Sequence, residues 1–219
     1  MKLIVVRHGH PDYEKDCLTE LGHNQAEAAG KRLENEYFDK VYSSTMGRAF
    51  ETAQHIVGSR GLEIEQLDFI REISTGPIST PRPENYNFWT LVSDYVRNGN
   101  SVMDEKWYEK MPFSDNKVVD SFYKLAKASD EFLASLGYVR ENDYYRVAEP
   151  QYKNVLLACH GGASSCLFAR LFNLPLPFVI SSFSLDFTNI TVIDFSGQKG
   201  ELIAPKFKVA VDARHIEEI

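Results

Sequence analysis

The chain is poor in cysteine, with only three among its 219 residues. Cys17, Cys159 and Cys166 match the spacing of neither a zinc site nor a redox pair, and an odd count does not suggest a disulfide framework. Cys159 lies in an apolar run and Cys166 in a segment with helical spacing, so we expect both to be buried as small apolar groups. The sequence therefore excludes a small disulfide-stapled fold and predicts reduced thiols.

Long apolar runs and excess positive charge are also missing. Only four consecutive apolar residues, 3–6, precede Arg7, which is too few for a signal peptide or for a membrane helix of about 20 residues. The 24 Lys and Arg face 31 Asp and Glu, so the formal net charge is −7. This balance argues against a general affinity for nucleic acid or for an anionic membrane. We expect a cytoplasmic protein in which an anionic substrate needs a local basic pocket.

What the sequence does contain is the composition of an ordinary globular domain. Hydrophobic residues make up 43% and charged residues 25%, far from the composition of a disordered chain. A chain of this length buries roughly 70% of the surface that it exposes when unfolded. There is no internal repeat. We therefore predict one domain over residues 1–219 and leave its oligomeric state open.

Apolar runs alternate with segments of helical spacing. Strands are predicted over residues 3–6, 41–44, 155–159 and 206–211, more weakly over 62–70, and as one or two strands within 184–195. Helices are predicted over residues 20–37 with Thr19 as N-cap, 46–57 and 163–172. This alternation predicts an α/β fold, a three-layer α/β/α sandwich with a mostly parallel central sheet.

Residues 76–152 interrupt this alternation and are interpreted as a helical insertion. Three prolines at 77, 81 and 83 open the stretch, and aromatic-rich helical segments follow around 88–96 and 118–136. Long segments near functional sites often act as lids. Aromatics at helical spacing are also typical of a packed core. A lid over the active site is the preferred interpretation, and a packed helical flank is the alternative.

Four segments place reactive side chains at predicted strand ends or helix starts. They contribute Arg7 with His8, Arg48, Glu72 and His160. Open α/β sheets bind ligands outside the carboxyl ends of their strands, and arginine forks match phosphate oxygens. The starts of the two helices that follow residues 44 and 160 would add N–H donors. With an imidazole as nucleophile and a carboxyl group as acid and base, the set favours phosphoryl transfer and requires no metal.

These residues stand in four motifs that resemble those of the histidine phosphatase superfamily, also called phosphoglycerate mutase-like. The first motif combines Arg-His-Gly at 7–9 with a downstream Leu-Thr-x-x-Gly-x-x-Gln-Ala at 18–26. Ser-x-x-x-Arg-Ala-x-x-Thr-Ala occupies 44–53, an acidic residue with Gly four positions later is Glu72, and a second His-Gly is 160–161. The resemblance covers the whole chain except the insertion, and all four motifs in order are specific.

The resemblance implies a role for each matched residue. His8 would be the phosphorylated nucleophile, Arg7, Arg48 and His160 would form the phosphate pocket, and Glu72 would be the proton donor. Further neighbours of the pocket would be Gly9, Thr19, Gly161 and Asn189. The implied enzyme is a phosphoric monoester hydrolase of the histidine acid type. It would need neither metal nor cofactor and would act on a small phosphorylated metabolite.

Two departures from the family pattern bear on the substrate. His10 stands where the family usually has Gln or Glu, and Pro-Ile-Ser at 77–79 replaces a common Trp-Glu-Gly. A phosphoglycerate mutase is the close alternative, but such members resemble Arg-His-Gly-x-Ser-x-x-Asn, whereas 7–14 reads Arg-His-Gly-His-Pro-Asp-Tyr-Glu. Hydrolysis is therefore favoured over transfer.

Two alternatives lie outside this enzyme class. One is a non-catalytic phospho-ligand binder, although every catalytic position is filled. The other is a metal pair formed by His8 and His10, since His-x-His is a common ligand spacing. The remaining histidines, His23, His55 and His215, are interpreted as solvated.

Overall fold

The computed structural model describes residues 1–83, 86–150 and 152–211, and the chain divides into two compact units. The first unit contains Met1–Arg71, Asp130–Gly161 and the chain from Leu185 onwards. The second unit contains Glu72–Ser129 and Gly162–Ser184. A single domain over 1–219 and a lid role for residues 76–152 stay predictions.

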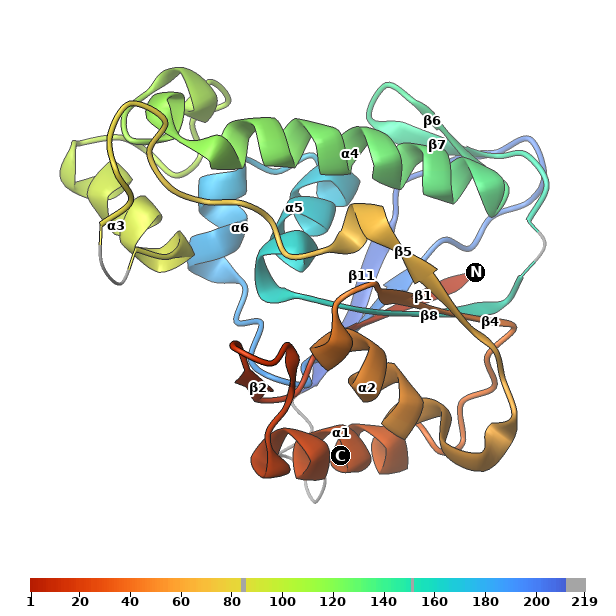
Figure 1. The fold of residues 1–219 in the computed structure, drawn as a ribbon. Coiled ribbons are helices and arrows are strands. Elements are labelled where there is room, and N and C mark those ends of the chain that lie inside the picture. Colours follow the sequence, from red (N-terminus) through yellow and green to blue (C-terminus); the bar gives the residue numbers. More distant parts are fainter. Residues whose placement is uncertain (84–85, 151, 212–219) are drawn as a thin grey trace. The chain divides into compact units, whose positions relative to one another are not determined.

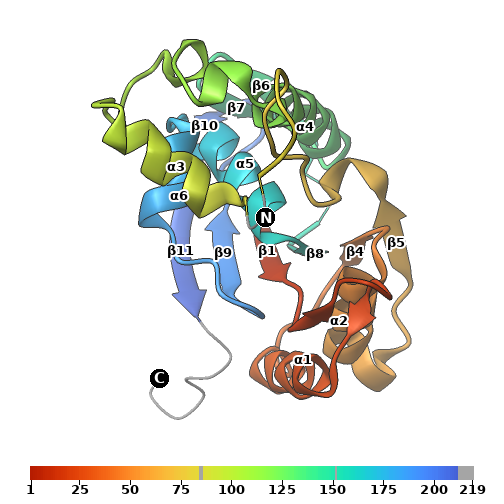
Figure 2. The same ribbon diagram turned by 60° about the vertical axis from the view of Figure 1, so that its left-hand side comes forward.

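The first unit is built on a six-stranded, mostly parallel sheet with the order β11-β9-β1-β8-β4-β5 (Figures 1 and 2). Neighbouring strands pair in parallel from β1 through β8 and β4 to β5, whereas β9 runs antiparallel to both β1 and β11. The strands are β1 (Lys2–Arg7), β4 (Lys40–Ser44), β5 (Ile64–Leu67), β8 (Asn154–Cys159), β9 (Ile190–Asp194) and β11 (Lys206–Val211). The predicted mostly parallel sheet is confirmed, with residues 206–211 as its edge strand.

Helices cover both faces of this sheet, because successive strand residues point to opposite sides. Val41 of β4 belongs to an apolar cluster with Ala29 of α1 (Glu20–Arg32) and Ile56 of α2 (Gly47–Val57). The next residue, Tyr42, contacts Phe132 with ring centroids 5.1 Å apart. Phe132 lies in the part of α4 (Lys117–Ser135) that belongs to the first unit. The predicted α/β/α layering is therefore confirmed in this unit.

Helix α1 begins where the sequence predicts and ends earlier. Thr19 is its N-cap, with the side-chain oxygen accepting a hydrogen bond from the Gly22 N–H at 3.1 Å. The helix stops at Arg32 instead of continuing to residue 37. Leu33 and Phe38 are both buried in the core beneath the sheet, so the chain leaves the helix in order to bury the second of them. Tertiary packing, and not helical spacing, sets this end.

Two small antiparallel sheets of the first unit were not predicted. One is formed by β6 (Tyr138–Glu141), β7 (Tyr144–Val147) and β10 (Leu202–Ile203). The other pairs β2 (Pro11–Asp12) with β3 (Cys17–Leu18). The stretch 76–152 is therefore not helical throughout, and within 184–195 the only strand is β9.

The second unit is mainly helical, and the helical segments predicted around 88–96, 118–136 and 163–172 are present as helices. Its helices are α3 (Phe88–Arg97), the first part of α4, α5 (Gly161–Phe172, whose first residue belongs to the first unit) and α6 (Leu176–Ser182), with 3-10 turns at Trp107–Glu109 and Phe113–Asp115. Aromatic rings form its core, for Phe113 lies 5.1 Å from both Tyr95 and Trp107 between centroids. Figure 2 shows α3 beside α6. Helix α6 was missed because Pro175 suggested an end, whereas here it is the N-cap of a new helix.

Two expectations about the chain as a whole can be compared with the structure. Cys159 and Cys166 are buried, as predicted, and Cys17 is half-buried. Burial raises the pKa of the Cys166 thiol well above its ordinary value. Among the helices of the described residues, none has the length and apolarity to cross a membrane. A cytoplasmic location stays a prediction.

Candidate active site

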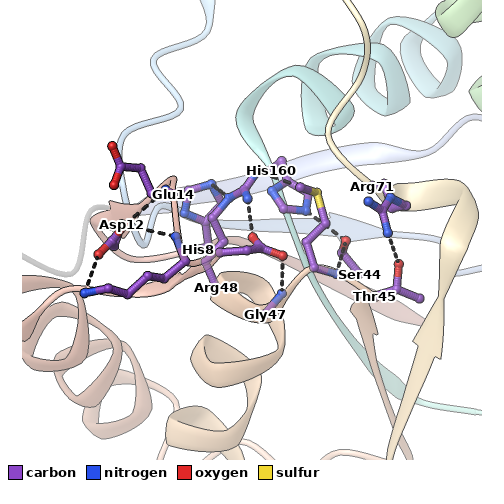
Figure 3. A network of polar contacts seen from close by, with 12 residues as sticks. His8, Asp12, Glu14, Ser44, Thr45, Gly47, Arg48, Arg71 and His160 are labelled. Atoms are coloured by element: carbon purple, nitrogen blue, oxygen red, sulfur yellow. Dashed lines mark hydrogen bonds and ion pairs between the residues drawn. The ribbon is translucent and has the colours of Figure 1, made fainter.

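Three parallel strands bring the first site residues to one edge of the sheet. In the strand register Arg7 is level with Cys159, and Ser43 is level with Ala158. The residues that follow or end these strands, His8, Ser44 and His160, therefore leave the sheet side by side. The rings of His8 and His160 lie 5.0 Å apart between centroids, and Figure 3 shows both together with Arg48.

The contacts of His8 define which of its ring nitrogens is free to react. The ring is buried, and its Nδ1 lies 2.7 Å from the carbonyl oxygen of Gly9. A carbonyl can only accept, so Nδ1 carries the hydrogen. The Nε of Arg48 donates to His8 Nε2 over 3.3 Å. Nε2 therefore carries a lone pair, which is what a nucleophile needs, and this lone pair accepts the Arg48 hydrogen bond.

Both imidazoles are kept neutral by their surroundings. Burial lowers the pKa of His8 to about 3, and the positive charges of Arg7 and Arg48 add to this. Burial likewise lowers the pKa of His160 to about 2, with His8 and Arg48 acting in the same direction. Desolvation and nearby cations both disfavour imidazolium. A site crowded with guanidinium groups therefore keeps a neutral nucleophile.

His160 presents a hydrogen-bonding group with no partner among the described residues. Its Nε2 lies 2.8 Å from Ser44 Oγ, which itself accepts the N–H of Met46 at 3.2 Å. The Ser44 hydroxyl proton is thus available to Nε2, and in that tautomer Nδ1 carries a hydrogen. This Nδ1 is buried and unpaired. A buried unpaired donor is costly, and an anionic ligand oxygen would satisfy it.

Arg48 lies at the start of α2, and its guanidinium group is paired with a carboxylate. Its side chain is 5% exposed and forms an ion pair through Nη1 with Asp16. The other Asp16 oxygen accepts the N–H of Gly47, the first residue of α2, at 2.9 Å. The prediction that this helix start offers its N–H groups to phosphate is therefore wrong for Gly47. Sequence reasoning also missed Asp16, since nothing in its local pattern marks a contact with a helix 31 residues away.

Arg7 is held by the loop that leads into β9. Its Nη1 donates to the carbonyl oxygen of Leu185, and its guanidinium carbon lies 4.3 Å from the centre of the Phe187 ring. The carbonyl oxygen of Asn189 accepts the Arg7 N–H at 3.1 Å. A Cβ added to Gly161 would lie 3.2 Å from the guanidinium carbon, so glycine permits this approach. Asn189 thus supports Arg7 through its backbone, and Gly161 does so through its small size.

Gly9 and Thr19 hold the loop around His8. The Gly9 N–H donates to Thr52 Oγ1 at 3.1 Å, and a Cβ at Gly9 would lie 2.5 Å from the Gly22 carbonyl oxygen. Thr19 Oγ1 lies 3.0 Å from His10 Nδ1. His10 and Thr19 are therefore tied to each other. Both residues stabilise the loop locally, and their role as pocket neighbours stays a prediction.

Glu72 belongs to the second unit, where it caps helix α5. Its carboxylate accepts the N–H groups of Gly162 at 3.4 Å and Ala163 at 3.1 Å. A Cβ at Gly162 would lie 2.6 Å from a carboxylate oxygen of Glu72. The second helix start that was expected to bind phosphate therefore holds this carboxylate instead. The contacts fix the orientation of the carboxyl group, and its role as proton donor stays a prediction.

The structure does not favour the expectations for the other histidines. His23 on α1 and His55 on α2 are half-buried and hydrogen-bonded through Nδ1 and Nε2 at 2.9 Å, so their interpretation as solvated is wrong. His215 lies outside the described residues.

Within the described part of the chain, no three His, Cys, Asp or Glu side chains form a group that could hold a metal ion. In the pair His8 and His10, both Nδ1 atoms already have protein partners.

Comparisons with known proteins agree on a family. The model of the histidine phosphatase superfamily, branch 1, matches residues 3–129. A 2,3-bisphosphoglycerate-dependent phosphoglycerate mutase of Bartonella tribocorum is 30% identical over 77% of this chain and 80% of its own. Phosphoserine phosphatase 1 of Hydrogenobacter thermophilus is 24% identical over 93% of this chain and 90% of its own.

A solved structure agrees at the level of the fold. The phosphoserine phosphatase of Entamoeba histolytica, crystallised with phosphoserine, aligns over 98% of both chains with a TM-score of 0.63 and 21% identity. The resemblance noted in the sequence is thus supported by an independent family match that spans the Arg-His-Gly motif, the second arginine motif and Glu72. The chain belongs to the histidine phosphatase superfamily, branch 1.

Proposed function

We propose that this protein hydrolyses phosphomonoesters through a phosphohistidine on His8. The observation that carries the proposal is the state of His8, whose neutral ring directs an unprotonated Nε2 at the guanidinium of Arg48. A nucleophile that faces a cation is arranged for an anionic electrophile. The buried, unpaired Nδ1 of His160 beside it supports the same assignment.

The reaction has two steps. In the first, His8 Nε2 attacks phosphorus, the bond from phosphorus to the ester oxygen breaks, and Glu72 donates a proton to the departing alkoxide. In the second, Glu72 takes a proton from water, the water oxygen attacks phosphorus, and the bond to Nε2 breaks to release phosphate. General acid and base catalysis by one carboxyl group serves both steps. No metal enters either step.

The phosphate pocket is formed by Arg7, Arg48 and His160. The guanidinium groups of Arg7 and Arg48 neutralise the charge that spreads over the equatorial oxygens of the transferring group, and the neutral ring of His160 donates one hydrogen bond to it. Arg48 Nε donates to His8 Nε2, so attack on phosphorus requires that this Nε shifts onto a phosphate oxygen. Substrate binding thereby uncovers the nucleophile.

The substrate class is a small phosphorylated metabolite. The named relatives act on or bind such compounds, and one crystal structure holds phosphoserine. Because the net charge of the chain is −7, attraction of an anionic substrate depends on the local cations of the pocket. The histidine acid type of phosphatase stays a prediction. A phosphoglycerate mutase is the second candidate, because the Bartonella relative carries that name.

The proposal is tested by hydrolysis of a panel of phosphomonoesters in EDTA by the parent and by His8→Ala. The panel includes phosphoserine and 3-phosphoglycerate, the latter with and without 2,3-bisphosphoglycerate. We expect phosphate release by the parent, loss of turnover in His8→Ala, and an acid-labile label on the parent after brief exposure to a ³²P-labelled substrate.

Other outcomes separate the alternatives. Isomerisation without phosphate release would identify a mutase, and binding without turnover or label would identify a non-catalytic binder. Turnover by His8→Ala within tenfold of the parent would overturn the phosphohistidine mechanism. Activity that EDTA abolishes and zinc restores would replace it with metal chemistry.

A further inference from the structure

We propose that Asp16 is a positioning residue that holds the guanidinium of Arg48 in the orientation in which it meets both His8 and a bound phosphate. This inference rests on the proposed function and adds a residue that the family motifs do not contain. It is carried by contacts within the first unit, between the loop that joins β2 to β3 and the start of α2, where Figure 3 labels Gly47 and Arg48.

The carboxylate of Asp16 binds two groups at the start of α2. One oxygen pairs with Arg48 Nη1, and the other accepts the Gly47 N–H at 2.9 Å. The Arg48 side chain is 5% exposed, whereas that of Asp16 is 39% exposed. Because the guanidinium is buried and planar, fixing one of its nitrogens fixes the direction of the others. Asp16 therefore determines where the remaining donors of Arg48 point.

Those remaining donors point to the reacting atom. Arg48 Nε donates to His8 Nε2 over 3.3 Å. The third nitrogen, Nη2, lies 3.6 Å from the sulfur of Met46, which is a weak acceptor. With Nη1 held by Asp16, Nε and Nη2 are the donors that can move onto phosphate oxygens at the nucleophile. The carboxylate of Asp16 binds Gly47 and Arg48, so its effect on His8 passes through Arg48.

The backbone holds Asp16 firmly in this place. Asp16 has φ of +53°, a left-handed conformation that L-residues other than Asn and Asp seldom adopt. A Cβ on Gly47 would lie 2.1 Å from the Asp16 carbonyl oxygen, so this close approach requires glycine. Two residues on, the Leu18 N–H donates to Glu51 of α2 at 2.6 Å. The chain is thus held against α2 at Asp16 and again two residues later.

The test compares Asp16→Ala and Asp16→Asn with the parent and with Asp12→Asn. Asp12 ends β2 directly before this loop, and its carboxylate accepts the N–H groups of Glu14 and Lys15 and pairs with Lys15 Nζ at 3.3 Å, so it is a matched control. We expect Asp16→Ala to lower kcat for phosphoserine by about 10- to 100-fold, as loss of alignment does, with a smaller change in KM. The kcat of Asp16→Asn should lie between those of Asp16→Ala and the parent, and the kcat of Asp12→Asn should equal that of the parent.

Two further readouts separate positioning from a structural effect. The double variant Asp16→Ala/Arg48→Ala should be no slower than Arg48→Ala, since Asp16 acts through that side chain. Binding of inorganic phosphate, measured by calorimetry, should weaken about tenfold in Asp16→Ala while its thermal unfolding remains cooperative. The calorimetric readout applies even if the parent hydrolyses nothing, so the failure of the proposed function and the failure of this inference are distinguishable.

Three results would overturn the inference. Tighter phosphate binding by Asp16→Ala would show that the carboxylate competes with substrate for Arg48. Additive losses in the double variant would show that Asp16 acts independently of Arg48. Parent-like kcat and phosphate affinity in Asp16→Ala would show that it has no functional effect.

Discussion

At the scale of single residues, the site is governed by where protons and charges lie. The sequence could predict that Arg7, His8, Arg48 and His160 meet, because each follows a recognisable strand or begins a helix. It could not predict that His8 holds its proton on Nδ1, since this depends on the Gly9 carbonyl oxygen 2.7 Å away. The contact between Asp16 and Arg48 could not be predicted either, because only the folded chain brings these two residues together.

The role of Glu72 is tested at this scale by Glu72→Gln. The two N–H groups of Gly162 and Ala163 are accepted by different oxygens of Glu72. Glutamine keeps one oxygen, which can accept the shorter bond from Ala163, and loses the 3.4 Å contact with Gly162, but it cannot protonate an alkoxide. We expect hydrolysis of phosphoserine to slow by about 10² to 10⁴. Hydrolysis of p-nitrophenyl phosphate should slow much less, because its leaving group is a weak base. The measurement is kcat/KM for both substrates.

Glu63→Gln is the control for this change, because Glu63 is an exposed residue of the segment that leads to Glu72. It should leave both rates unchanged. If Glu72→Gln lowers kcat/KM equally for the two substrates, Glu72 acts by stabilising the start of α5 and not as a proton donor. If kcat/KM for phosphoserine does not fall, Glu72 has no part in the mechanism.

At the scale of helices and strands, the interiors of elements were predictable and their contacts were not. β1 and β8 are continuous apolar runs, and such runs are typical of buried parallel strands. The starts of α2 and α5 carry no such local signal of their partners. Asp16 and Glu72 occupy them from distant positions in the chain, which satisfies donors that a helix leaves unpaired.

Helices α1 and α2 are joined by an imidazole pair whose contribution to stability can be measured. His23 Nδ1 and His55 Nε2 are 2.9 Å apart, and a Cβ on Gly30 would lie 2.8 Å from the His55 carbonyl oxygen, so the helices are in close contact. We expect a coupling free energy of about 0.5 to 1.5 kcal/mol between His23→Ala and His55→Ala. Urea unfolding of the two single variants and the double variant at pH 7.5 provides it.

The neighbouring exposed residues Asn24 and Gln54 supply a matched control pair on the same two helices. Their alanine variants should have additive effects on the free energy of unfolding. If the effects of the two histidine variants on the free energy of unfolding are additive as well, the hydrogen bond between the rings makes no net contribution to stability. Solvation of each ring by water then replaces it fully.

At the scale of the whole molecule, the order of motifs along the chain identified the family where overall identity is low. A relative that covers more than 90% of the chain shares about a quarter of its residues, whereas four short motifs of this chain hold the two arginines, two histidines and the acidic residue by which the resemblance was noted. Chemistry restricts these positions, whereas packing tolerates many apolar replacements. The identity of the substrate depends on positions outside these motifs, such as His10, and the sequence could not specify it.

The buried histidines should also make the stability of the whole molecule depend on pH. His8 and His160 have pKa values of about 3 and about 2 in the folded protein, below about 6.5 in an unfolded chain. Below pH 6.5 the unfolded state therefore binds more protons than the folded state, and stability falls as the pH decreases towards 3. Above pH 6.5 neither state binds these protons, so the two groups add no pH dependence there.

Removing one of these imidazoles should reduce this dependence. In His8→Asn the free energy of unfolding should fall less steeply below pH 6.5 than in the parent, by up to about 1.4 kcal/mol per pH unit, and His160→Asn should behave alike. Urea unfolding at pH 7.5, 6.5, 5.5 and 4.5 measures these slopes. The buffers must lack phosphate, because an anion bound at the site stabilises the folded state. Parallel curves for the parent and both variants would mean that folding leaves the pKa of both imidazoles near its unfolded value, and burial would then not be what keeps His8 neutral.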